Sequence, residues 1–148
     1  MKYKMLSSVI LFALSQTVFA NIQNKPASCP TLSSIKSVGI NEAYLLNNMW
    51  MFFIKQNNFG TKEQWTFIME GALPTHDKAQ AIAEANARLS GLKFANGPEK
   101  TDTSGRESYS CGYLPEGQPD QHGIFFAVAI TPPVELPDMK QILKKMAG

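Results

Sequence analysis

The chain has 148 residues, of which 44% are hydrophobic and 18% are charged, and its formal net charge is +2. This length predicts one globular domain with a single core and excludes two full-sized domains. Two of the basic residues, Lys2 and Lys4, belong to a hydrophobic leader. Without them basic and acidic residues are equal in number, so charge gives no reason to expect nucleic acid or an anionic membrane surface as a partner.

Residues 1–20 have the pattern of a secretory signal peptide. Two lysines precede the mostly apolar run 5–19, which is too short and too rich in hydroxyl groups to span a bilayer, and Val18 and Ala20 supply the small residues of a cleavage site. We therefore expect an exported protein, periplasmic or extracellular, whose mature part is one domain, residues 21–148. No later apolar run is long enough to predict a transmembrane segment.

Both cysteines, Cys29 and Cys111, belong to the mature chain. An even number of thiols in an exported protein most simply forms a disulfide bond, and a pair of free thiols is the alternative. Cys29 is expected at the start of a short helix, because Pro30 favours a first helical turn and Gly39 fits a C-terminal cap.

A β-hairpin is predicted within residues 49–70. Apolar side chains alternate along 49–55 and 64–70, with turn residues between them. A register with Phe52 opposite Phe67 collects the aromatic side chains on one face, which we expect to form the core. That face consists of Trp50, Phe52, Ile54, Trp65, Phe67 and Met69.

A central helix is predicted from His76 to Phe94, with Thr75 as its N-cap. Its apolar stripe consists of Ala81, Ile82, Ala85, Leu89 and Leu92. Residues 95–105 contain two glycines and a proline and are expected to form a loop.

A second hairpin is predicted from residues 107–114 and 124–131. Tyr109, Cys111 and Tyr113 share the core-facing side of its first strand. In the second strand, alternation separates a core-facing set, Ile124, Phe126, Val128 and Ile130, from Phe125, Ala127 and Ala129.

A final helix is predicted from Pro137. Its apolar side consists of Met139, Ile142, Leu143 and Met146, and its basic side of Lys140, Lys144 and Lys145. We find no repeat in the sequence.

These elements predict an α+β fold with the order α-β-β-α-β-β-α. Two hairpins form a four-stranded antiparallel sheet, with the central helix and the short N- and C-terminal helices on one face. The other face would carry Met51, Phe53, Ile68 and Phe125, an apolar patch suited to a partner. The alternative is that the C-terminal helix or residues 21–28 cover this patch.

The chain has no catalytic motif, so no catalytic residue and no enzyme activity are predicted. The trio Glu116, Asp120 and His122 lacks a diagnostic ligand spacing, so we predict no metal site. Haem is the candidate cofactor, bound non-covalently because no Cys-x-x-Cys-His motif is present. The side chains that could ligate or contact it are His76, His122, Tyr109 and Tyr113, for which ordinary core or loop positions are the alternative.

Several short motifs resemble a family of small, signal-peptide-bearing proteins of Gram-negative intracellular pathogens, some of which are called haemin-binding proteins. The motifs are Cys29-Pro30, Ser34-Ile35-Lys36, Gln64-Trp65-Thr66-Phe67, Cys111-Gly112-Tyr113 and Thr131-Pro132-Pro133. The resemblance implies a virulence-associated, non-enzymatic binding protein whose partner is haemin or a host protein. A small hydrolase without a recognisable motif and a structural envelope component are the alternatives, and the oligomeric state stays open.

Overall fold

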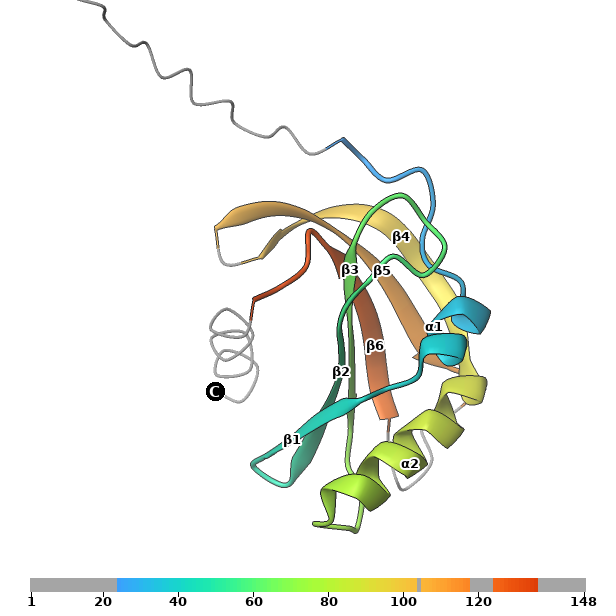
Figure 1. Ribbon diagram of the computed structural model, residues 1–148, viewed down its shortest axis with the longest axis vertical. Helices are drawn as coiled ribbons and strands as arrows, with labels where there is room; N and C mark the ends of the chain where they lie inside the picture. Colours follow the sequence, from blue (N-terminus) through green and yellow to red (C-terminus); the bar gives the residue numbers. More distant parts are fainter. Residues whose placement is uncertain (1–23, 104, 118–123, 136–148) are drawn as a thin grey trace, which may run out of the picture.

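The computed structural model describes residues 24–103, 105–117 and 124–135, which form one antiparallel sheet and two α-helices (Figure 1). In chain order the elements are α1 (Leu32–Val38), β1 (Glu42–Leu46), β2 (Met49–Asn57), β3 (Trp65–Gly71), α2 (Lys78–Arg88), the single 3₁₀ turn η1 (Leu89–Gly91), β4 (Leu92–Thr103), β5 (Arg106–Pro115) and β6 (Ile124–Thr131).

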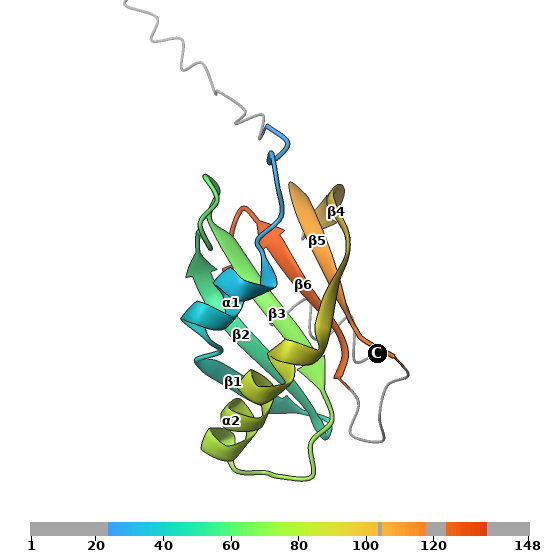
Figure 2. The same cartoon turned by 90° about the vertical axis from the view of Figure 1, so that its right-hand side faces the viewer.

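The six strands lie in the order β1-β2-β3-β6-β5-β4, and α1 and α2 lie on the same side of the sheet (Figure 2). The same order of elements occurs twice along the chain, a helix followed by three antiparallel strands: first α1 with β1, β2 and β3, then α2 with β4, β5 and β6. The last strands of the two series, β3 and β6, pair at the middle of the sheet, with Ile68 opposite Val128. The two halves are therefore arranged about a pseudo-two-fold axis between these strands.

The expected four-stranded sheet with three helices is wrong, because two strands were not recognised. β1 is short and follows α1 closely, and it joins β2 through Asn47 and Asn48, whose φ angles of 50° and 63° fit a two-residue hairpin turn. β4, which ends at Thr103, occupies most of the expected loop 95–105. It is an edge strand, and its pairing with β5 shifts register on both sides of Asn96. An edge strand tolerates Pro98, because the backbone groups on its outer side need no partner strand.

The helices follow local capping chemistry. Thr31 accepts a hydrogen bond from the Ser34 amide at the start of α1, and the Gly39 amide donates to Ile35 at its end, so Gly39 is confirmed as the cap. Asp77, not Thr75, caps α2. Helix α2 is therefore shorter than predicted, and Leu92 begins a strand instead of extending the helix. The helix expected from Pro137 lies outside the described residues.

The α2 side chain of Asn86 ties the helix to the segment between α1 and β1. Its Oδ1 accepts a hydrogen bond from the Ile40 amide at 2.7 Å, and its Nδ2 donates to the Ile40 carbonyl at 3.0 Å. This pair of bonds fixes α2 to the segment that joins α1 to β1.

The division of the first hairpin into two faces is confirmed. Phe52 pairs with Met69 and Ile54 with Phe67, so the register differs by two residues from the expected one and every side chain stays on its expected face. All six residues of the expected core face are buried in the main core together with Ile35, Ala81, Ala85 and Leu89 from the helix side.

The faces expected for β6 are inverted, because Ala127 and Ala129, not Val128 and Ile130, belong to the main core. Ala129 pairs with Phe67 and Ala127 with Tyr113, and these two rings meet edge to face with centroids 5.9 Å apart. Two rings leave room only for small side chains on the strand between them.

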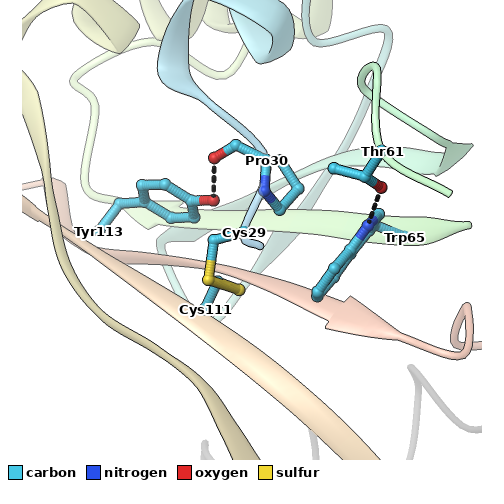
Figure 3. The surroundings of a disulfide bond; sticks show 6 residues. All are labelled: Cys29, Pro30, Thr61, Trp65, Cys111 and Tyr113. Atoms are coloured by element: carbon cyan, nitrogen blue, oxygen red, sulfur yellow. Dashed lines mark hydrogen bonds between the residues drawn. A yellow bond between two sulfur atoms is a disulfide. The ribbon is translucent and has the colours of Figure 1, made fainter. Parts of the chain in front are cut away.

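A disulfide bond joins Cys29 and Cys111, which are 82 positions apart (Figure 3). Beside it, the Tyr113 hydroxyl donates a hydrogen bond of 2.7 Å to the Pro30 carbonyl. Both links attach the segment that precedes α1 to the helix side of β5.

Candidate functional site

The side of the sheet opposite α1 and α2, here called the distal face, carries a second apolar cluster. It consists of Met51, Phe53, Ile68, Ile130 and Val134. Three of the four residues expected on this face, Met51, Phe53 and Ile68, lie together, but they are only 3%, 1% and 5% exposed. The expected exposed patch is therefore a buried layer. The side chain of Phe125 lies outside the description, and the β3–β6 pairs place Val128 and Ile130 on this face instead.

Thr66 fastens the segment after β6 to the distal face. Its hydroxyl donates to the Lys55 carbonyl at 2.5 Å and accepts a hydrogen bond from the Val134 amide at 2.9 Å, in a buried position. Because Pro132 and Pro133 follow the last strand residue, the chain leaves the sheet and returns over it at Val134. One hydroxyl thus connects β2, β3 and this segment.

Beside the cluster, β4, β5 and β6 form a hollow of about 570 Å³. It is lined by Ala95, Asn96, Gly112, Tyr113, Leu114, Phe126, Ala127 and Val128. Val128 also packs against the distal cluster, so the two features are continuous. The hollow is open to solvent, and most of its lining is apolar.

Gly112 and Asn96 determine the shape of this hollow. They pair across β4 and β5, and a Cβ atom at position 112 would collide with Asn96 Oδ1. The missing side chain of Gly112 therefore leaves space for the amide of Asn96, a polar group among the lining residues. Sequence patterns alone do not predict that these two residues meet. A glycine inside an apolar strand is the signal for such a close approach.

Glu70 lies on β3 at the border between the cluster and the hollow. Its register partners are Met51 on one side and Phe126 on the other. Burial among these apolar groups raises the pKa of its carboxyl group. Among the described residues, no hydrogen bond or ion pair reaches this carboxylate. By contrast, Glu42 pairs with Lys55 at 2.6 Å, which lowers its pKa.

The structure describes three of the four candidate haem ligands, His76, Tyr109 and Tyr113. Tyr113 is fully buried with its hydroxyl bound to Pro30, and burial raises its pKa strongly. Tyr109 is also buried on β5, His76 is exposed before α2, and no described contact joins His76 to either tyrosine. His122 lies outside the described residues.

A smaller hollow of about 350 Å³ lies beside the disulfide and is lined by Cys29, Pro30, Thr31, Leu32 and Phe94. The Phe94 ring is half exposed and meets Tyr113 edge to face at 6.0 Å. It offers an apolar wall without a charged group.

Within the described ranges, no group of three histidine, cysteine, aspartate or glutamate side chains is arranged to hold a metal ion. None of the described helices is long and apolar enough to cross a membrane. Comparison with known proteins found no matching family model, no matching curated protein and no matching solved structure.

Proposed function

We propose that the chain is an exported, non-enzymatic binding protein whose ligand contacts the hollow on the distal face. The observation that carries the proposal is the hollow itself, with walls of Leu114, Phe126 and Val128 and the Asn96 amide as its polar group. The disulfide bond supports export, because such bonds persist in oxidising compartments.

Haemin is the first ligand to test, in line with the family resemblance of the sequence. A flat macrocycle can pack against the apolar walls of an open hollow while its carboxylates stay in water. Among the described residues, His76 does not line the hollow, and the Tyr113 hydroxyl is bound to Pro30. We therefore propose that the apolar walls of the hollow hold the haemin macrocycle by packing, and that neither His76 nor Tyr113 is an axial ligand of its iron.

The test is a titration of mature protein with haemin, followed by the Soret band. Leu114→Asp should weaken binding about tenfold or more, because it removes apolar contact from an exposed position in the hollow. Leu45→Asp is the matched control, since Leu45 is an exposed leucine on β1 outside the hollow. Equal affinity of both variants, or no saturable change with the parent protein, would contradict the proposal.

The same titration separates ring contact from axial ligation. His76→Ala and Tyr113→Phe should leave the spectrum of the complex unchanged. A different Soret maximum in either variant would show that the residue ligates the iron.

A further inference from the structure

We infer that the C-terminal segment, residues 136–148, docks on the distal face of its own chain and covers the cluster of Met51, Phe53, Ile68, Ile130 and Val134. This intramolecular docking concerns the cluster, which meets the neighbouring hollow at Val128, and its tests do not use haemin.

The composition of the cluster favours a covering layer of structure. Four of its five members come from β2, β3 and β6, and Val134 is the described member from outside the sheet. An apolar sheet face is stabilised when a second layer of structure packs on it. Val134 begins such a layer.

The C-terminal segment starts from a fixed position on the distal face. The hydrogen bond from the Val134 amide to Thr66 Oγ1 fixes the chain on the distal face. The segment therefore begins next to the cluster. In helical form it would be roughly 20 Å long, enough to cross about four strands of the sheet.

The side chains of the C-terminal segment are complementary to the distal face. Met139, Ile142, Leu143 and Met146 recur at the spacing of one helix face, and the flexible methionines suit an irregular apolar surface. The same segment carries Lys140, Lys144 and Lys145. Glu70 on this face has a half-buried carboxylate without a described partner, and a lysine brought close to it would favour its ionised form and offset the effect of burial.

The N-terminal segment does not fit as the cover. The disulfide bond holds Cys29 against Cys111, whose side chain belongs to the core on the helix side, and Pro30 receives the Tyr113 hydroxyl there. Residues 24–28 therefore approach the sheet from the side opposite the cluster.

The direct test is zero-length carbodiimide crosslinking of the mature full-length protein. We expect an amide bond between the Glu70 carboxylate and a lysine of residues 136–148, found by mass spectrometry in the monomer fraction. Glu70→Gln should abolish this crosslink, and Glu84→Gln on α2 should leave it. A crosslink confined to the dimer fraction would identify a second copy as the occupant, and no crosslink to Glu70 would equally overturn the inference.

A second test changes the segment. Ile142→Asn with Leu143→Asn should expose the cluster, increase the fluorescence of anilinonaphthalene sulfonate and lower the Tm by roughly 5 °C or more. The matched control, Lys144→Asn with Lys145→Asn, should leave the dye fluorescence at the parent level. Equal dye binding by both double variants would contradict docking through the apolar side. Haemin affinity is measured separately with Leu114→Asp, so the failure of one proposal is distinguishable from the failure of the other.

Discussion

The side-chain amide of Asn96 occupies the space over Gly112, its register partner across β4 and β5. This relationship joins an irregular edge strand to a regular inner strand, because β4 shifts register on both sides of Asn96 while β5 and β6 pair without a shift. The absence of a side chain at Gly112 therefore leaves room for this amide at the edge of the hollow.

Gly112→Ala should change the free energy of unfolding by less than about 1 kcal/mol, because Asn96 is exposed and its amide can rotate away from the added methyl group into solvent. Chemical denaturation of the variant and the parent protein measures the change. A loss of roughly 2 kcal/mol or more would show that the Asn96 side chain is held firmly over Gly112.

Replacing both cysteines with serine should lower the free energy of unfolding by up to roughly 4.5 kcal/mol, because the bond closes a long loop in the unfolded chain. Intact mass after alkylation checks the bond directly. Neither cysteine should be labelled before reduction, and both should be labelled after reduction and unfolding.

Tyr113→Phe should cost about 1–2 kcal/mol, because it leaves the buried Pro30 carbonyl without the donor that now reaches it. The parent protein should also lose stability with rising pH above 10, the ordinary pKa of tyrosine. Burial raises the pKa of Tyr113 in the folded state, so above pH 10 its hydroxyl stays protonated in the folded protein but ionises in the unfolded chain. The unfolded state is therefore increasingly favoured as the pH rises towards the folded-state pKa. Unfolding midpoints between pH 8 and 11 test this, and the Phe variant should lose less stability over that range.

Thr66→Val should destabilise the protein by roughly 2–4 kcal/mol, since it removes one hydroxyl that serves two buried backbone groups, the Lys55 carbonyl and the Val134 amide. Thr66→Ser keeps both hydrogen bonds and is the control. Hydrogen exchange at the Val134 amide should accelerate in the valine variant and stay slow in the serine variant. Unchanged exchange in Thr66→Val would show that another group holds this segment.

The parts of the fold that local patterns determine could be predicted from the sequence. The faces of β2 and β3 follow from simple alternation, and the cap at Gly39 follows from its place after a helical run. Alternation also placed Cys111 on the side of β5 that faces Cys29. Each of these depends on residues close together in the chain.

The parts that depend on distant neighbours could not be predicted in this way. Ala127 and Ala129 are weakly hydrophobic, and only the rings of Phe67 and Tyr113 on the flanking strands explain why they belong to the core. The hollow likewise requires the pairing of Asn96 with Gly112, which β4 must form first. A strand that contains Gly97 and Pro98 reads locally as a loop, so this pairing is not visible in the sequence.

The pairing of β3 with β6 joins two halves of the sheet that carry different surfaces. Without this pairing, each helix with its three strands would leave its last strand with an open edge. On the distal face, β4, β5 and β6 carry the hollow, whereas β2 and β3 carry three of the five cluster residues. A substitution that disturbs the β3–β6 pairs therefore affects both surfaces, because the two features meet at Val128 beside this seam.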